Sequence, residues 1–433
     1  MFLRASWIAL TLAAFALDAA TVAQEPTEET LPVEEPPLDE HPLEEDEDEV
    51  SSDALRDPFF AKVIRRIRIV DKPRFSLEIG GKLHLQYYDA DSDDSDNEDA
   101  LYVRRFRPFV YGHFLENWLW KFDLELSSEE GTLELSTNDL NIRDAYVRFE
   151  GFRREGWRLT GGNQKVPFSR DFMNPSTSQL FPERTFVGDN NVGVPSRGVG
   201  LHFRGRTNSE RLVFWGSLAR VVHTQDVDRM RWDSPIGQSS ELNEGLVSVA
   251  RLDIRPRGEP VVTGPPREQP KTYTISVAAY RWSNDSGAAL TMDGIALDPE
   301  RADLDDAWGL ELSGGLQGSG LRLDAELNLI HGETVVDDFD GGIYVDGETD
   351  LRVGALQGGY YVLGSRLEAT AGLTFIDSDS SKNTTRHGIV GLNVYMSENY
   401  QSKLQVSHRW IFNDAGDPSA DFREIRIQLQ YVW

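Results

Sequence analysis

From Phe75 to the C-terminal Trp433, apolar and polar residues alternate with a period of two. Successive side chains of a strand point to opposite faces, so each such segment has one apolar wall and one polar wall. The alternation is clearest in 75–88, 320–331 and 365–376. Beyond the N-terminal region, no stretch is continuously apolar over the roughly 20 residues that a membrane-spanning helix needs. The pattern therefore predicts an all-β fold.

Sixteen segments of this kind can be delimited, and long and short connections alternate between them. They are 75–88, 101–116, 118–128, 141–151, 156–165, 197–206, 211–220, 244–256, 272–282, 305–315, 320–331, 349–363, 365–376, 386–397, 399–411 and 421–433. An even number of strands of about ten residues predicts a 16-stranded antiparallel transmembrane β-barrel with long outer loops. The connection 257–271 is long where a short turn is expected, so it is either an insertion or a slip in the strand count.

A soluble β-sandwich or β-helix also alternates, and the pattern alone does not separate these folds from a barrel. The last segment favours the barrel, because an unbroken apolar face ends there in the aromatic Trp433. A barrel must close this strand against the first one, since lipid cannot satisfy an open sheet edge.

The N-terminal region predicts export to the bacterial outer membrane. Arg4 precedes a short apolar run and small residues, which is typical of a signal peptide cleaved after Ala23. Between Glu25 and Asp57 there are fifteen acidic residues and one basic residue, so this part is predicted to be disordered. The predicted organisation is a signal peptide at 1–23, an acidic Pro/Glu-rich leader at 24–57, a short basic periplasmic segment at 58–74 and the barrel at 75–433.

The residues give no sign of catalysis, of a cofactor or of a metal centre. There is no cysteine, and the eight histidines show no metal-ligand spacing. The acidic run Asp89–Asp99 lacks the glycine that a calcium loop needs at its sixth position, where Asp94 stands. We interpret it as a solvated outer loop, with divalent-ion bridging at the membrane surface as the alternative.

The face opposite the apolar wall is assigned to the lumen and carries more basic than acidic residues. The basic ones are Lys82, Arg105, Arg107, Lys121, Arg148, Arg158, Arg204, Arg206, Arg251, Arg255, Arg322, Arg352, Arg366, Lys403, Arg409 and Arg426. The acidic ones are Glu78, Asp123, Glu125, Asp144, Glu150, Asp253, Glu311, Asp324, Glu326, Glu368 and Glu424. Such a wall favours anions, although barrels of any selectivity carry charges of both signs.

Five segments, in this order, resemble the phosphate-selective porin O and P family. They are FSLEIGGKLHLQ (75–86), RRFRPFVYG (104–112), IRDAYVRF (142–149), GGNQKVPF (161–168) followed by FPER (181–184), and RGVGLHFRG (197–205). The resemblance covers about 75–206. It implies a trimeric 16-stranded porin whose third loop, here 166–196, folds inward and narrows the pore.

By the same resemblance, Arg104 or Arg105 and Lys165 would face passing anions, and Asp144 would line the same zone. Adjacent strand residues point to opposite faces, so Arg104 and Arg105 cannot both face the lumen unless the strand is distorted. The more polar face favours Arg105 together with Arg107. Arg184 of the third loop is a further basic residue expected to face passing anions, but the same loop also carries acidic residues.

The expected function is passive diffusion of small anions, phosphate among them, through a homotrimeric porin in contact with outer-membrane lipid and not with nucleic acid. The expected pore-lining and anion-binding residues are Arg104, Arg105, Arg107, Lys121, Asp144, Arg148, Lys165, Arg184 and Arg204. Two alternatives stay open: a general, non-selective diffusion porin, and a structural outer-membrane barrel with a plugged pore.

Overall fold

The computed structural model describes residues 67–72, 74–92, 98–126, 141–152, 156–185, 192–224, 227–236, 244–257, 271–284, 303–363, 366–380, 384–396, 402–414, 417 and 420–433. All of them belong to one compact unit, Phe59–Trp433. The predicted signal peptide, the acidic leader and the first part of the basic segment lie outside the described residues. Among the described residues, no helix is long and apolar enough to cross a membrane.

The described chain is almost entirely strand. The strands are β1 (Ile67–Lys72), β2 (Phe75–Ser92), β3 (Glu98–Phe114), β4 (Trp118–Glu125), β5 (Asn141–Phe149), β6 (Arg158–Lys165), β7 (Arg197–Arg206), β8 (Leu212–Thr224), β9 (Arg231–Asp233), β10 (Glu244–Ile254), β11 (Thr272–Asn284), β12 (Leu304–Gly318), β13 (Leu321–Thr334), β14 (Glu348–Leu363), β15 (Leu367–Ser378), β16 (Thr385–Tyr395), β17 (Lys403–Phe412) and β18 (Phe422–Val432). Two short helices, α2 (Arg170–Met173) and the 3-10 helix η2 (Ser176–Ser178), interrupt this pattern between β6 and β7.

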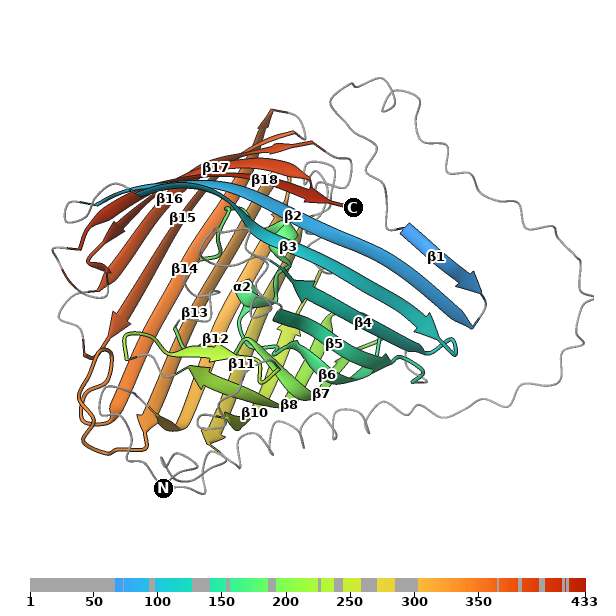
Figure 1. Cartoon of the computed structure of the whole chain (residues 1–433), viewed down its shortest axis with the longest axis horizontal. Coiled ribbons are helices and arrows are strands. Elements are labelled where there is room, and N and C mark those ends of the chain that lie inside the picture. The colour runs from blue at the N-terminus through green and yellow to red at the C-terminus, as the bar shows by residue number, and fades with distance from the viewer. Residues whose placement is uncertain are drawn as a thin grey trace, which may run out of the picture. The chain divides into compact units, whose positions relative to one another are not determined.

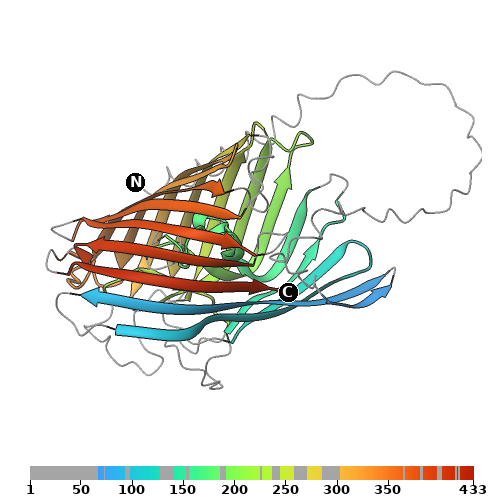
Figure 2. The ribbon, with the colours of Figure 1, turned by 90° about the horizontal axis from the view of Figure 1, so that it is seen from above.

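Within the described part of the chain, eighteen strands form one sheet. All except β1 and β9, and therefore sixteen, follow one another round a closed antiparallel ring in which β8 pairs with β10 and β18 with β2 (Figures 1 and 2). The last residue takes part in this closure, because the Trp433 amide donates to the Gly81 carbonyl and the Gly81 amide donates to the Trp433 carbonyl, both at 3.1 Å. Closure satisfies the backbone groups that lipid cannot, and the predicted 16-stranded barrel is confirmed.

Tight turns join neighbouring strands at one end of the ring. Between β3 and β4, Leu115 and Glu116 both have positive φ, at 52° and 60°. Between β12 and β13, Ser319 and Gly320 have φ of 56° and 82°. Ser319 and Gly320 alone separate the paired Gly318 and Leu321, so they form the type I′ turn of a two-residue hairpin, whereas three residues separate the paired Phe114 and Trp118. These turns lie at the end where short connections are predicted.

The long connection 257–271 lies at this same end, between β10 and β11. The two strands pair directly from Gly245 with Asn284 to Ile254 with Ile275. Because consecutive strands stay neighbours, the strand count does not slip, and the extra residues are an insertion. Residues 258–270 lie outside the described part of the chain.

The outer wall of the ring is apolar and exposed. Leu312 and Leu373 expose 55% and 65% of their surface, whereas the next residues along their strands, Ser313 and Thr374, are buried inside. A continuous apolar surface of this kind is what the lipid-facing band of an outer-membrane barrel presents, and no second sheet covers it within the described residues.

The outward orientation of Leu373 can be tested by substitution. Replacing Leu373 with arginine should destabilise the barrel by about 2–4 kcal/mol, because the charge would enter the hydrocarbon layer. The measurement is chemical unfolding of the reconstituted barrel in lipid vesicles. Leu373→Ala is the matched control, since it removes apolar area without adding charge. Equal effects from the two variants would contradict a lipid-facing position.

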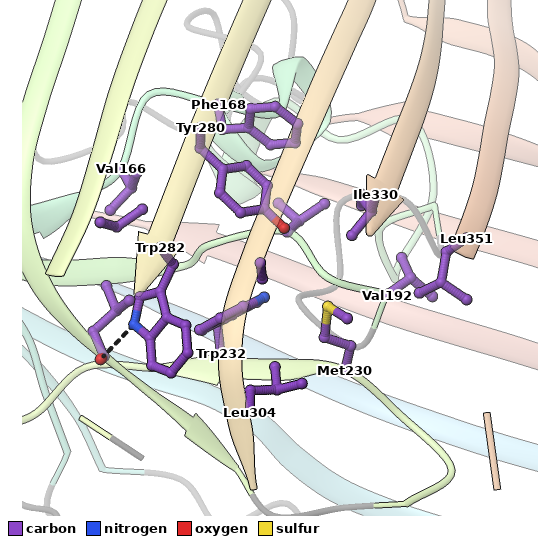
Figure 3. Close-up of a cluster of buried hydrophobic side chains, with 14 of the residues drawn as sticks. Val166, Phe168, Val192, Met230, Trp232, Tyr280, Trp282, Leu304, Ile330 and Leu351 are labelled. Atoms are coloured by element: carbon purple, nitrogen blue, oxygen red, sulfur yellow. Dashed lines mark hydrogen bonds between the residues drawn. The ribbon is translucent and has the colours of Figure 1, made fainter. Parts of the chain in front are cut away.

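The inner wall is not polar throughout, and this differs from the sequence-based expectation. On the side formed by β8 and β10–β14, the interior holds an apolar core that includes Trp232, Trp282 and Met230, all completely buried (Figure 3). The connection that carries β9 folds inward there, and the Met230 carbonyl accepts the Gly193 amide at 2.7 Å. Part of the lumen is therefore filled by packed side chains.

The same core explains one incorrect lumen assignment. Arg352 was expected to face the pore, but its side chain is 67% exposed on the outer wall and lies 3.6 Å from Asp377. Its neighbours Leu351 and Val353 are buried in the apolar core instead. The predicted face is inverted at this end of β14 because the interior is apolar there.

Candidate functional site

The third loop, between β6 and β7, enters the interior of the ring and is fastened to its far wall. Ser169 caps α2 by accepting the Phe172 amide at 3.0 Å. Two wall carboxylates bind the start of this helix: Glu311 on β12 accepts the Arg170 amide at 2.9 Å, and Glu326 on β13 accepts the Asp171 amide at 2.7 Å. These bonds satisfy amides that a helix start leaves without an intrahelical partner, and they hold the loop inside the lumen, where Figure 1 places α2.

The opposite wall binds the following part of the loop through its carbonyl groups. Gln405 on β17 and Asn393 on β16 donate to the Leu180 carbonyl at 3.2 and 3.0 Å. Lys82 on β2 donates to the Ser176 hydroxyl at 2.8 Å. The loop thus spans the ring from β12 and β13 to β2, β16 and β17, as the resemblance implies for a constriction loop.

Arg104 and Arg105 both face this loop, and they bind the same carboxylate. Glu183 accepts from Arg104 Nε at 2.7 Å and from the Arg105 guanidinium at 3.1 Å. The pairing of β3 with β2 shifts by one residue between positions 103 and 105. Such a bulge turns an extra side chain to the same face of a strand. This bulge is the strand distortion that allows both arginines to lie on the same side of β3.

Glu183 is the loop residue that this arginine pair holds. Burial disfavours its charged form, but Arg104, Arg105 and Arg426 outweigh burial and keep the pKa of its carboxyl well below the usual range. The carboxylate therefore stays ionised, and its attraction to the arginines adds to the attachment of the loop.

A second bulge brings in an arginine that the sequence analysis missed. The pairing of β5 with β4 shifts by one residue between positions 142 and 144. Arg143, at that shift, donates to Glu125 at 3.2 Å, and Arg107 from β3 binds the same carboxylate. Arg143 directly precedes the predicted Asp144, but strict alternation assigned it to the lipid face. The residue pattern alone does not reveal this bulge, so it could not place Arg143 on the inner face.

Lys121 and Asp144 form the neighbouring ion pair. Lys121 Nζ lies 2.6 Å from Asp144 and 3.2 Å from Asp123. Arg197, the first residue of β7, also binds Asp144, at 3.0 Å. Arg197 was not among the expected site residues, although its place at the return of the third loop was a usable signal.

Lys165 and Arg184 lie at the loop but use their donors to hold it together. Lys165 Nζ donates to the carbonyls of Met173 and Asn174 at 3.2 and 3.0 Å. Arg184 donates to the Asn174 carbonyl at 2.8 Å, and both cations lie over the Phe172 ring. The two residues therefore stabilise the conformation of the loop from within.

Arg148 and Arg204 lie apart from this cluster, nearer the end with the tight turns. Together with Arg158 they line a cavity of about 280 Å³ that Lys165 and Met173 border from the loop side. Within the described residues, no group of three or more His, Asp or Glu side chains could hold a metal ion.

Residues 77–234 match the family model for phosphate-selective porin O and P. The match includes the two bulges, the third loop and the cavity, and it extends the resemblance expected for 75–206. A comparison with curated proteins found no match.

The porin fold also appears among solved structures. An anion-selective porin from Comamonas acidovorans is 11% identical, with a TM-score of 0.55, and the alignment covers 83% of this chain and 100% of that one. A loop L8 deletion mutant of OmpT from Vibrio cholerae is 10% identical, with a TM-score of 0.52 and coverage of 83% and 100%. The outer membrane channel DcaP of Acinetobacter baumannii is 12% identical, with a TM-score of 0.50 and coverage of 84% and 99%. At these identities the similarity establishes the fold.

Proposed function

We propose that this chain is an outer-membrane porin through which small anions diffuse passively. The observation that carries this proposal is the excess of basic residues on the part of the inner wall that β2–β5 and β7 form beside the third loop. The basic residues are Lys82, Arg104, Arg105, Arg107, Lys121, Arg143 and Arg197, and the acidic residues in contact with them are Asp123, Glu125, Asp144 and Glu183. Inside a low-dielectric wall, such an excess lowers the energy of an anion relative to a cation.

The comparisons support this proposal. The family model over 77–234 describes phosphate-selective porins, and one solved porin of the same fold is described as anion-selective. Arginine presents a planar fork that matches the oxygens of phosphate and carboxylate. Inorganic phosphate is therefore one of the small anions that we propose as cargo.

The proposed setting is the bacterial outer membrane, with the tight turns on the periplasmic side, as in other barrels with an even strand number. We propose a homotrimer on the basis of the family resemblance. Chemical cross-linking of the detergent-solubilised barrel, followed by electrophoresis without boiling, tests this assembly.

Removing the charge of Glu125, or of its partner Arg143, tests the selectivity of the pore for anions over cations. Glu125→Gln should increase anion selectivity and Arg143→Gln should decrease it, because the two side chains lie 3.2 Å apart and carry opposite charge. A unit charge about 8 Å from a permeating ion changes its energy by about 0.5–2 kcal/mol. The anion-to-cation permeability ratio should therefore change about twofold or more, in opposite directions. The measurement is the reversal potential in a potassium chloride gradient across a planar bilayer.

Two results would count against this assignment. A cation-selective wild-type channel would reject the proposed anion preference. Shifts of the same sign in both variants would mean that they act through the structure of the wall and not through its charge.

A structural barrel with a closed lumen is the second candidate, and the apolar core inside β8 and β10–β14 favours it. The third loop adds to this, since Val166 and Phe168 are completely buried. Single-channel recording separates the candidates, because a plugged barrel would give no conductance steps. A conducting channel with a permeability ratio near one would instead indicate a general diffusion porin.

A further inference from the structure

The cavity between the third loop and the tight-turn end is strongly basic. Its charged lining consists of Arg148, Arg158, Lys165 and Arg204, against a single acidic residue, Asp144. Asp144 is already bound to Lys121 and Arg197. Glu150, which is not part of the lining, lies 3.7 Å from Arg148. With this carboxylate included, basic residues around the cavity still outnumber acidic ones.

Two of these arginines lie directly opposite each other on adjacent strands. Arg158 on β6 pairs in register with Arg204 on β7. Directly opposed like charges destabilise a sheet. No carboxylate of the described residues lies within ion-pair distance of Arg158; the guanidinium instead lies 5.5 Å from the centre of the Trp215 ring. A bound anion between the two guanidinium groups would remove this repulsion.

Neighbouring side chains hold the arginines in place before any ligand binds. Arg204 lies 4.9 Å from the centre of the same Trp215 ring, and Trp215 Nε1 donates to Asp253 at 2.9 Å, which fixes the ring. Arg148 donates to the Thr160 hydroxyl at 3.2 Å. Side chains ordered in this way lose less conformational entropy on binding, which favours affinity.

The size of the cavity indicates which anion fits. A volume of about 280 Å³ corresponds to about nine water molecules at roughly 30 Å³ each. An inorganic phosphate ion would fill only part of it. Part of the lining is apolar, from Pro167 and Met173 of the third loop, and can contact a carbon skeleton.

We propose that this cavity is a binding site for small organic phosphate monoesters, with the phosphate between Arg158 and Arg204 and the organic part against Pro167 and Met173. The inference rests on the proposed function, because the cavity lies in the pore that carries anions. It adds a site for a larger anion on the periplasmic side of the third loop.

The test uses the full-length protein in planar bilayers, with glycerol 3-phosphate and inorganic phosphate as probes. Glycerol 3-phosphate should block the chloride current at a lower concentration than inorganic phosphate does. Arg158→Gln and Arg204→Gln should each raise its half-blocking concentration about tenfold or more, since each removes a charge-assisted hydrogen bond. Arg220→Gln, on the outer face of β8 and paired there with Glu244, is the matched control and should change nothing.

Calorimetric titration of the detergent-solubilised protein with the same probes measures binding without conduction. A silent channel that still binds glycerol 3-phosphate through Arg158 would reject the porin function and retain the site. An anion-selective channel that both probes block equally, or whose block is the same in Arg158→Gln, would retain the porin and overturn the site.

Discussion

Replacing Glu183 with alanine should release the end of the third loop and raise the single-channel conductance. Glu183 is buried and is the loop carboxylate bound by Arg104 and Arg105. Removing one partner of a buried ion pair costs about 3–5 kcal/mol, because the remaining charge stays buried and unpaired. That cost corresponds to a hundredfold or larger shift toward the released conformation, at about tenfold per 1.4 kcal/mol. The freed arginines should also increase anion selectivity.

The matched control for this variant is Glu244→Gln. Glu244 forms an ion pair with Arg220 at 2.7 Å on the outer wall, away from the loop. Its replacement should leave conductance and reversal potential unchanged. If Glu183→Ala conducts like the wild type, Glu183 does not hold the loop in place, and its contacts with β2, β12, β13, β16 and β17 are sufficient.

The second large effect is expected at Trp232, and it concerns stability. This side chain is completely buried in the apolar core inside the barrel, and its ring centroid lies 4.9 Å from that of Trp282. Trp232→Ala should lower the free energy of unfolding by about 3–5 kcal/mol, since it leaves a cavity that the surrounding strands cannot close. Guanidinium unfolding of the barrel in detergent micelles measures this loss.

Trp308→Ala is the control for the loss of an indole ring. Trp308 lies on the outer wall and is 40% exposed, so lipid or detergent can occupy the space that the ring leaves. Trp308→Ala should therefore lower the free energy of unfolding much less than Trp232→Ala does. Equal losses would mean that the core inside β8 and β10–β14 adds little to stability and that the loops over it are loosely packed.

The charged site shows where reasoning from alternation succeeds and where it ends. Arg107 and Lys121 lie on the predicted face, because the pairing of β3 with β2 does not shift from Arg105 to Tyr111, and that of β4 with β3 does not shift around Lys121. Arg104 and Arg143 each stand at a bulge, where the register between two strands shifts by one residue. A bulge depends on the pairing of both strands, so the local pattern of either one does not reveal it.

The third loop was predicted to fold inward by resemblance, but its attachment could not be predicted. Glu311 and Glu326 bind the start of α2 from more than 130 residues further along the chain. Nothing in their strands distinguishes them from other lumen-facing carboxylates. Their role appears only when barrel closure brings β12 and β13 opposite the loop.

The sequence by itself determined the barrel, because lipid outside the ring requires an apolar residue at every second position of each membrane-spanning strand, and this alternation can be read from the residues. Only the tertiary structure decided which side chains meet inside. The bulges at Arg104 and Arg143, the carboxylate of Glu183 between two arginines and the apolar core around Trp232 all depend on contacts between distant segments. Such contacts follow from strand register and loop packing, and these are set by the closed ring as a whole and not by the residues of any one strand.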